Sequence, residues 1–445
     1  MLSLQRTYEA GLAHFRAHRF AEAESCFRTV VVADPRFATG YYMLGTALNF
    51  LGKWDAAADA FRAAIAIDPK LARAHAGLGS MLERQGRIDE AEAHLREAIT
   101  LDPGLNLACN ALAELLRGEG KLRDARTLYE AVLARTPEDR LARFGRGFLS
   151  LLEGDFASGW DDYEYRVSTG RPPGPAFAPQ WRGENPAGKT LLIYDEQGLG
   201  DTIQCLRYAA PLAKSGARVI VSVPATLTDL ASRVEGVHRV VASDGAPPPF
   251  DFCAPMLSLP LHCRTTLANI PWNGPYLSPP PGRAMPVAIP PNDTGQLTVA
   301  LAWAGNPDNP YNYIRSLSIS QIEPLLETRG VRWLVLQQGA TAAELGPRNN
   351  VLHLGDQLTN FSDIATIICL ADLTISVDTS FCHLAGALGR AVWTLLSYVP
   401  DWRWLLQRPD SPWYPSMRLF RQSAPRDWAP VVANVSQALD HYEKM

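Results

Sequence analysis

The chain has 445 residues, of which 47% are hydrophobic and 20% charged, and its 46 acidic and 42 basic side chains leave a net charge of −4. This composition is typical of a globular protein, and at roughly 100–200 residues per domain the length predicts about two to four domains. Without an excess of basic residues, the composition argues against a chain whose main partner is nucleic acid or an anionic membrane.

The seven cysteines are scattered, and no two are spaced as a CxxC pair. Such a set predicts buried free thiols in a reducing compartment, and neither a disulfide framework nor a zinc site. The N-terminal stretch MLSLQRTYEAGLAHFRAHRF lacks the apolar core of a signal peptide, and no apolar run is long enough to span a bilayer. We therefore expect a cytoplasmic protein.

The first third of the chain repeats itself every 34 residues. In LGTALNFLGKWDAAADAFRAAIAIDP, which starts at Leu44, small residues, large apolar residues and a closing proline recur in four registers. Small residues such as Gly45 let paired helices approach closely, and the proline ends each second helix. This period and pattern resemble the tetratricopeptide repeat (TPR). The resemblance implies a superhelix of antiparallel helix pairs, with a concave surface suited to an extended peptide.

A degenerate fifth unit, GRGFLSLLEGDFASGWDDYEYR, contains the crowded aromatic residues Trp160, Tyr163 and Tyr165. A terminal repeat must either cap the stack or dock on another part of the protein. We favour docking on the next domain, because no polar capping helix follows. The helical repeat domain is expected to span residues 1–168.

Two linkers rich in proline and glycine are expected at residues 169–188 and 283–296. After each linker, short β-rich runs alternate with helical patterns, which predicts two Rossmann-like lobes with parallel sheets at 189–282 and 297–445. The last helical segment, DWAPVVANVSQALDHYEK, is expected to cross back to the first lobe. Ligands of open parallel sheets bind beyond the carboxyl ends of the strands. The candidate sites are the loops that follow Tyr194, Ala302, Leu336 and Val377.

The loop VDTSFCH places Asp378, Thr379 and Ser380 between a strand and a helix. The free N–H groups at a helix start favour an anion, above all phosphate. His383 follows Thr379 by four residues, so both side chains can lie on one side of the first turn. The alternative is an ordinary N-cap with a structural histidine. We favour a phosphate site.

In the opposite lobe, the loop YDEQGLGDT combines acidic residues with two glycines. Gly198 and Gly200 are expected to let the backbone approach a substrate. Asp201 lies in the first turn of a helix, where an acidic residue by itself is most often a cap or a dipole partner. We interpret Asp195 as a reserve base and Glu196 as a solvated carboxylate.

Three segments resemble the ADP-heptose:lipopolysaccharide heptosyltransferases: GLGDTIQCLRYAAPLA, VALAWAGNPDNPYNYIRSLSISQIEPLL and VDTSFCHLAGALGRAVWTLL. The C-terminal two thirds are most similar to bacterial TPR proteins that carry a heptosyltransferase-like GT-B glycosyltransferase domain. The resemblance implies that Asp201 is the base for the acceptor hydroxyl and that Asp378 contacts the transferred sugar. It also implies that Thr379 and His383 bind the diphosphate.

The resemblance further implies a basic residue after the first strand of the second lobe, where Arg315 is the nearest candidate. The lysine in a Trp-Pro context that is usual in the family is absent here. Asn306 is expected to line the diphosphate, and Gln337 or Gln338 to reach the nucleotide or its base.

No metal or other cofactor is expected. The nucleotide-sugar enzymes that hold a metal usually do so with an Asp-x-Asp motif, and the chain contains none. A helix dipole, His383, Arg315 and hydroxyl groups can stabilise a leaving nucleoside diphosphate without a metal.

The segment DWRWLLQRPDSPWYPSMRLF alternates charged residues with Trp402, Trp404, Trp413 and Tyr414. These residues could line the acceptor side of a cleft or pack between the lobes. We favour packing, because buried aromatic side chains dominate cores and interfaces.

The leading hypothesis is a GT-B glycosyltransferase that moves a sugar from a nucleotide-diphosphate sugar to a protein recruited by the repeats. A glycan or lipopolysaccharide acceptor is the competing choice. An inactive TPR adaptor whose lobes bind nucleotide or sugar is a second hypothesis, and a sugar-nucleotide epimerase is a third.

Overall fold

The computed structural model describes residues 2–442, except 167–178, 273, 284, 286, 294, 308, 310, 311, 340, 341 and 343. The chain forms two compact units that divide between Arg146 and Gly147. Residues 169–178 of the first predicted linker, and residues 284, 286 and 294 of the second, lie outside the described residues.

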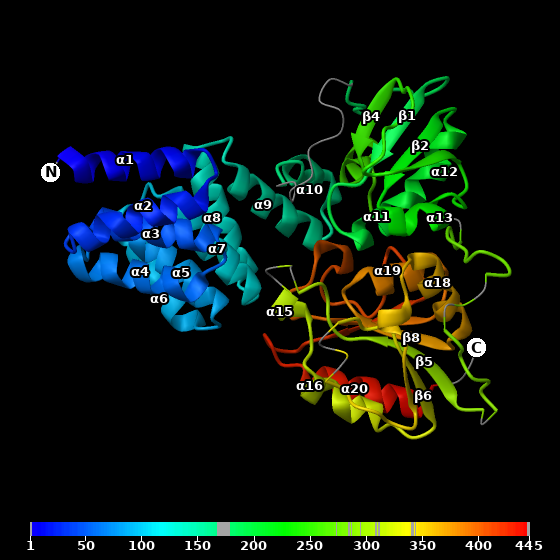
Figure 1. The fold of residues 1–445 in the computed structure, drawn as a ribbon. Helices are drawn as coiled ribbons and strands as arrows, with labels where there is room; N and C mark the ends of the chain where they lie inside the picture. The colour runs from blue at the N-terminus through cyan, green and yellow to red at the C-terminus, as the bar shows by residue number, and fades with distance from the viewer. Residues whose placement is uncertain are drawn as a thin grey trace. The chain divides into compact units, whose positions relative to one another are not determined.

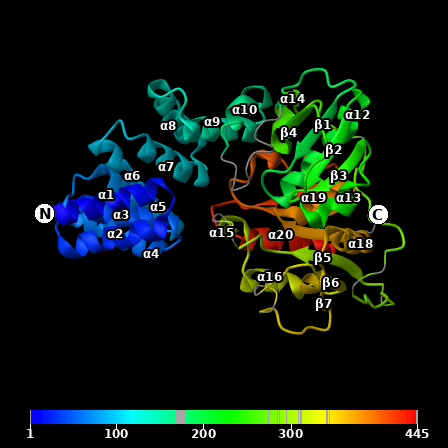
Figure 2. The same cartoon turned by 45° about the horizontal axis from the view of Figure 1, so that its top comes forward.

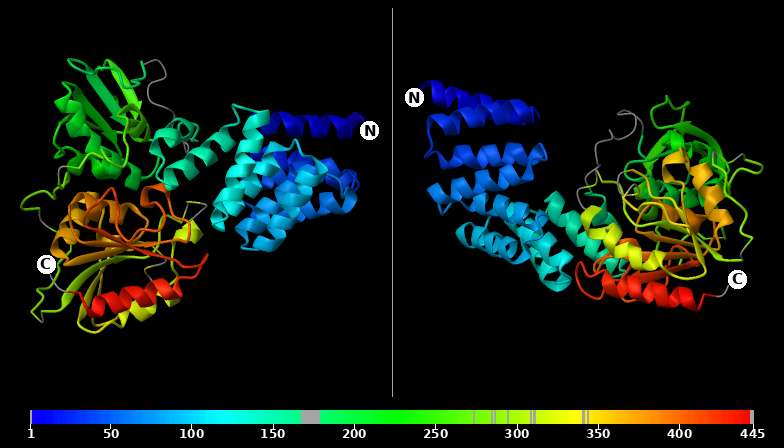
Figure 3. Two further views of the ribbon diagram at one scale, coloured as in Figure 1. Left: turned by 180° about the vertical axis from the view of Figure 1, so that it is seen from behind. Right: turned by 60° about the horizontal axis from the view of Figure 1, so that its bottom comes forward.

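The first unit is built from antiparallel helix pairs (Figure 3). Its helices are α1 (Leu2–Arg16), α2 (Phe20–Ala33), α3 (Ala38–Phe50), α4 (Trp54–Ile67), α5 (Ala72–Arg84), α6 (Ile88–Leu101), α7 (Asn106–Gly118) and α8 (Leu122–Arg135). A Cβ atom on Gly45 would lie 2.8 Å from the ring of Phe61, so a larger residue would separate α3 from α4. The even-numbered helices end two residues before the recurring prolines. The predicted helical superhelix is confirmed.

Helix α9 (Arg140–Leu152) contains the division between the units, and α10 (Phe156–Tyr163) belongs to the second. Trp160 and Tyr163 pack edge-on against Trp402, with ring centroids 5.1 and 5.7 Å apart. Trp160 also donates its Nε1–H to the carbonyl oxygen of Thr265 at 2.8 Å. The docking prediction is therefore confirmed. The compact repeat unit ends before residue 168 because these aromatic side chains are buried against the α/β unit.

The first lobe of the second unit has a parallel sheet in the order β3-β2-β1-β4 (Figure 2). The strands are β1 (Thr190–Tyr194), β2 (Arg218–Val223), β3 (Val237–Ala242) and β4 (Phe252–Pro255). The helices are α11 (Leu199–Cys205), α12 (Ala209–Lys214), α13 (Thr228–Ala231) and α14 (Leu259–His262).

The second lobe has a six-stranded parallel sheet in the order β10-β9-β8-β5-β6-β7. Its strands are β5 (Leu297–Ala302), β6 (Val331–Val335), β7 (Val351–His353), β8 (Leu373–Val377), β9 (Val392–Leu396) and β10 (Met417–Arg421). Its helices are α15 (Asn312–Arg315), α16 (Ile319–Leu326), α18 (Phe361–Leu370), α19 (Ser380–Ala387) and α20 (Ala429–Asp440).

Helices α18 and α19 cover the sheet face that is turned toward the first lobe, and α16 and α20 cover the opposite face (Figure 1). The apolar residues of α20, including Val431 and Val435, are buried in the core of the second lobe. The prediction that this segment crosses back to the first lobe is therefore wrong. Both parallel sheets are compatible with the Rossmann-like folds that were expected.

None of the helices described in the structure is both long and apolar enough to cross a membrane.

Candidate functional site

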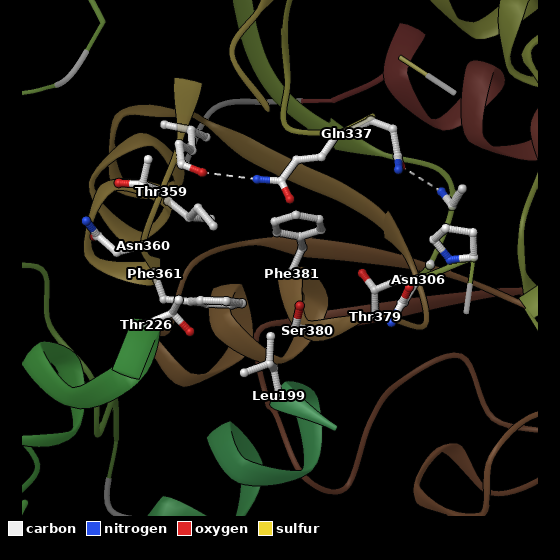
Figure 4. Close-up of a pocket in the computed structure, with 16 residues that line it drawn as sticks. Leu199, Thr226, Asn306, Gln337, Thr359, Asn360, Phe361, Thr379, Ser380 and Phe381 are labelled. Carbon is white, nitrogen blue, oxygen red and sulfur yellow. Dashed lines mark hydrogen bonds between the residues drawn. The ribbon is translucent and has the colours of Figure 1, made fainter. Parts of the chain in front are cut away.

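A pocket of about 380 Å³ lies between the two lobes of the second unit (Figure 4). We call it the interlobe pocket, and its lining residues are Leu199, Thr226, Ala304, Gly305, Asn306, Pro307, Gln337, Gln338, Leu358, Thr359, Asn360, Phe361, Ile364, Thr379, Ser380 and Phe381. Each of the four loops predicted at the carboxyl ends of strands contributes to this lining. Parallel pairing brings the loops after the neighbouring strands β8, β5 and β6 to one edge of the second sheet, and the loop after β1 of the first lobe faces them across the pocket.

Helix α19 points its N-terminus into the interlobe pocket, where Thr379, Ser380 and Phe381 form part of the wall (Figure 4). The Thr379 side chain makes no capping hydrogen bond to the helix. Its hydroxyl lies 3.0 Å from the Ser376 Oγ instead. The first N–H groups of α19 are thus not capped by Thr379, which suits an anion at this position.

Asn306 and Gln337 line the same pocket from the loops after β5 and β6. The Oε1 atom of Gln337 accepts hydrogen bonds from the backbone N–H groups of Trp303 at 3.2 Å and Ala304 at 2.9 Å. Gln337 therefore joins the two loops and shapes the wall beside Asn306.

Arg315 and Asp378 lie behind the pocket wall. The Nη1 atom of Arg315 donates to the backbone carbonyl of Asp378 at 3.0 Å. A Cβ atom on Gly305, which does line the pocket, would lie 3.0 Å from the Nε atom of Arg315. The guanidinium thus sits directly beneath a glycine of the wall, and its charge acts near the start of α19.

His383 is not part of the interlobe pocket, although its spacing from Thr379 predicted a shared side of the helix. The side chain is buried, and its Nδ1 atom lies 2.9 Å from the Tyr414 hydroxyl. Its Nε2 atom is 3.8 Å from the Asp378 carboxylate. The ring packs toward Gly200 of the first lobe, because four residues advance a helix by slightly more than one turn.

Asp378 and His383 have pKa values displaced in the directions that burial requires. Burial, together with the charge of Asp401, raises the pKa of Asp378 to about 6. Burial, together with Arg403, Arg207 and Arg315, holds the pKa of His383 well below its usual value. Both shifts favour the uncharged side chain in the folded protein.

These shifts predict opposite pH dependences of stability between about pH 4 and pH 6.5. The folded state takes up a proton at Asp378 before the unfolded state does, so acidification in this window stabilises the fold through Asp378. The unfolded state takes up a proton at His383 first, so acidification destabilises the fold through His383. The Asp378→Asn variant should therefore lose melting temperature more steeply than the wild type on going from pH 6.5 to pH 4. Parallel melting curves for the two proteins would contradict this assignment.

The Asp201 side chain caps the start of α11, although the N-cap residue Gly198 has no side chain to complete a reciprocal capping box. The Oδ2 atom of Asp201 accepts the Gly198 N–H at 2.9 Å, and Oδ1 forms an ion pair with Arg403. Arg403 also pairs with Asp401 at 2.8 Å. Asp201 is thus both a cap, as its local sequence predicts, and a partner of a cation from the other lobe.

Gly200 lies where α11 packs against α19. A Cβ atom at this position would lie 2.8 Å from the Cδ2 atom of His383. The absent side chain makes room for the histidine of the opposite lobe, whereas Gly200 was expected to make room for a substrate. A Cβ atom added to Gly198 would lie 3.0 Å from the Oδ2 atom of Asp201, so Gly198 faces this carboxylate.

The Gly200→Ala variant is expected to lower stability by about 1–3 kcal/mol, because the added methyl group overpacks the contact between the lobes. Urea unfolding measures this loss. Gly245→Ala is the control, since Gly245 is exposed and its added Cβ would meet only a carbonyl oxygen at 3.2 Å. Equal stabilities of the two variants would show that the Gly200 contact is not tight.

The two other acidic residues of the loop are not free surface groups. Glu196 pairs with Arg166 at 2.6 Å and accepts the N–H of Leu257 at 3.1 Å. The prediction that Glu196 is solvated is wrong, because a buried cation from the end of the helical region holds it in place. Asp195 is buried and accepts the Ser243 hydroxyl.

Asp378, Cys382 and His383 form the one group of three potential metal ligands among the described residues, with ligand atoms within 4.8 Å of one another. The Cys382 thiol donates to the Thr379 carbonyl at 3.0 Å, and burial raises its pKa. The thiol of Cys382 is protonated, and the neutral His383 is already hydrogen-bonded to the Tyr414 hydroxyl. The three side chains are therefore part of the internal packing and hydrogen bonding of the protein. Independence from metal stays a prediction.

The aromatic residues around Trp402 are packing residues, as favoured from the sequence. Trp402, Trp404, Trp413 and Tyr414 are at most 1% exposed. The sequence did not single out Phe361, Phe381 or Thr226 for the site, and it offered Arg403 only within the segment that was weighed for the acceptor side of a cleft. Phe381 could have been found from the sequence, because it lies between the predicted site residues Ser380 and His383.

Comparison with known proteins identifies the N-terminal repeats. Tetratricopeptide repeat models match residues 8–72, 50–106 and 82–144. Protein FlbA of Caulobacter vibrioides is 27% identical over 334 residues, which cover 68% of this chain and 56% of FlbA. The aligned part thus spans little more than half of FlbA.

Solved structures similar to this chain include TPR proteins. Pseudomonas aeruginosa pilF is 21% identical over 36% of this chain and 74% of its own, with a TM-score of 0.33. TTC0263 of Thermus thermophilus is 19% identical over 36% of this chain and 88% of its own, with a TM-score of 0.34. The first TPR of Spaghetti (RPAP3), bound to an HSP90 peptide, is 21% identical over 25% of this chain and 89% of its own, with a TM-score of 0.25.

Proposed function

We propose that the second unit is a GT-B glycosyltransferase that uses a nucleotide-diphosphate sugar. The observation that carries the proposal is the interlobe pocket, with the uncapped start of α19 in its wall at the carboxyl end of β8. The diphosphate is proposed to lie on the N–H groups of α19 with Arg315 behind Gly305. Asn306 and Gln337 then face the nucleotide.

The reaction transfers one sugar and needs one proton acceptor. In the proposed mechanism, the acceptor hydroxyl gives its proton to Asp201 while its oxygen bonds to the anomeric carbon. The bond from that carbon to the diphosphate oxygen breaks, and the N–H groups of α19 and the charge of Arg315 stabilise the leaving group. Arg403 forms an ion pair with the Asp201 carboxylate and orients it.

The acceptor is proposed to be a protein, because TPR superhelices offer a concave surface that suits an extended segment. A glycan acceptor uses the same chemistry at Asp201 and differs only in what the repeats contribute.

One observation favours a second candidate, an adaptor that binds nucleotide without turnover. Both carboxylate oxygens of Asp201 already accept hydrogen bonds, from Gly198 and from Arg403. A carboxylate whose two oxygens already accept hydrogen bonds has fewer lone pairs left to take a proton from an acceptor hydroxyl.

A panel of nucleotide-diphosphate sugars tests the proposal. Melting temperatures identify the nucleotides that bind, since a ligand of the folded state raises stability with the logarithm of its concentration. Release of nucleoside diphosphate, with transfer of sugar to a protein in a lysate of the source cells, would support the enzyme. Binding without release supports the adaptor, a rearranged sugar nucleotide would indicate an epimerase, and absence of binding contradicts the assignment of the pocket.

A further inference from the structure

A second pocket, of about 190 Å³, lies in the first lobe away from the interlobe pocket. We call it the Arg207 pocket; its lining residues are Arg207, Ala210, Pro211, Arg233, Val234, Glu235, Pro271, Trp272, Gly274, Pro275, Tyr276, Leu277 and Ser278. Residues 233–235 precede β3, and Ala210 and Pro211 belong to α12, so this pocket lies toward the amino end of β3 and beside α12. In the described part of the chain the two pockets share no lining residue.

The pocket contains a buried cation whose partners are all uncharged. Arg207 is 3% exposed. Its guanidinium donates to the carbonyl oxygens of Gln204 and Trp413, both at 2.9 Å, and to the Tyr276 hydroxyl at 3.2 Å. A guanidinium has five N–H donors and cannot lose its charge in a protein. Two of the five are therefore left without a protein partner among the described residues.

Aromatic rings supply the rest of the surroundings of Arg207. The guanidinium carbon lies 4.7 Å from the ring centroid of Tyr414, 5.1 Å from those of Tyr276 and Trp413, and 6.0 Å from that of Trp272. Ring faces attract a cation but compensate its lost hydration only in part. A buried charge without an opposite charge is costly, so this site gains from an anion.

The other charged residues of the pocket leave its floor positive. Glu235 is exposed and lies 3.4 Å from Lys214, with which it forms a surface ion pair. Arg233 is 3.7 Å from Asp229. The carboxylate of Glu235 is screened by water at the rim, whereas the charge of Arg207 is not.

We propose that the Arg207 pocket binds a small organic molecule through a carboxylate or phosphate group. The planar guanidinium matches the two oxygens of such a group. Trp272 and Tyr276 flank the pocket and provide apolar surface for the body of the ligand. The proposal does not depend on the function of the interlobe pocket.

Binding of D-glucuronate, glucose 6-phosphate and neutral methyl glucoside tests the proposal in the full chain at constant ionic strength. The melting temperature is expected to rise with at least one of the two anions and not with methyl glucoside. The two anions distinguish a carboxylate from a phosphate ligand.

Two substitutions locate the site. Ala210→Leu fills the pocket and is expected to weaken anion binding at least tenfold, while Ala213→Leu, on the same helix but outside the pocket, should leave it unchanged. Ser278→Asp at the exposed rim should also weaken binding, and Ser278→Asn should not. The proposal would be overturned if Ala210→Leu and Ala213→Leu bound the anion equally well, or if the two Ser278 variants did. It would also be overturned if neither anion raised the melting temperature of the wild type more than methyl glucoside does.

Discussion

Replacing Thr379 by aspartate is expected to weaken the binding of nucleoside diphosphates strongly and to leave the fold at least as stable as before. Thr379 is the N-cap of α19 and lines the interlobe pocket, but its side chain makes no capping hydrogen bond. Aspartate is among the best N-cap residues, so its carboxylate should accept the N–H groups that the diphosphate would use. At a separation of about 4 Å, two like charges repel by about 4 kcal/mol near a protein surface. We expect an affinity loss on the order of 100-fold or more.

The matched control is Thr379→Asn, which has the same shape as the aspartate variant and caps the helix without a charge. It should bind nucleotide at least tenfold more tightly than Thr379→Asp in isothermal titration calorimetry. If the aspartate and asparagine variants bind a nucleoside diphosphate equally well, the phosphate groups do not lie at the start of α19.

The Asp201→Asn variant is expected to lose sugar transfer by about 10²- to 10⁴-fold, the usual contribution of a general base. Nucleotide binding should persist, because Asp201 does not line the interlobe pocket. The asparagine can still accept the Gly198 N–H, so the start of α11 is preserved. Single-turnover rates and nucleotide affinity, measured on the same preparation, separate the two effects.

The loss of sugar transfer in Asp201→Asn could also arise because the ion pair between Asp201 and Arg403 is broken. A second substitution, at Arg403, tests this explanation. In Asp201→Asn alone, the buried guanidinium keeps only Asp401 as an ionic partner, which lowers stability. Adding Arg403→Gln removes the buried charge that has lost one of its two ionic partners, and should restore part of the melting temperature without restoring turnover. Recovery of both together would mean that Asp201 acts only through the ion pair between the lobes, and full activity of the single variant would exclude it as the base.

Local sequence patterns determined the repeats and the loops of the site. The 34-residue period predicted the helix pairs and their ends before Pro35, Pro69, Pro103 and Pro137. Alternating β-rich and helical runs predicted the two parallel sheets, but β10 was missed because its segment has the alternating aromatic and charged residues of a loop. Parallel pairing brings the three predicted loops of the second lobe to one sheet edge whatever their side-chain partners are, whereas the packing of the two lobes brings the loop after Tyr194 to the same pocket.

Partners that lie far apart in the sequence were decided only by the tertiary structure. Asp201 and Arg403 are 202 residues apart, and Arg207 meets Trp413 across 206. No local period carries such pairings, because they depend on how two lobes pack and not on helix or strand propensity. The sequence could likewise place His383 one turn into α19. Only the tertiary structure shows that its side chain faces Gly200 and Tyr414 instead of the interlobe pocket. The sequence by itself thus determined most of the elements and the sheet edge at which the candidate loops gather, and packing between the lobes decided which charges meet there.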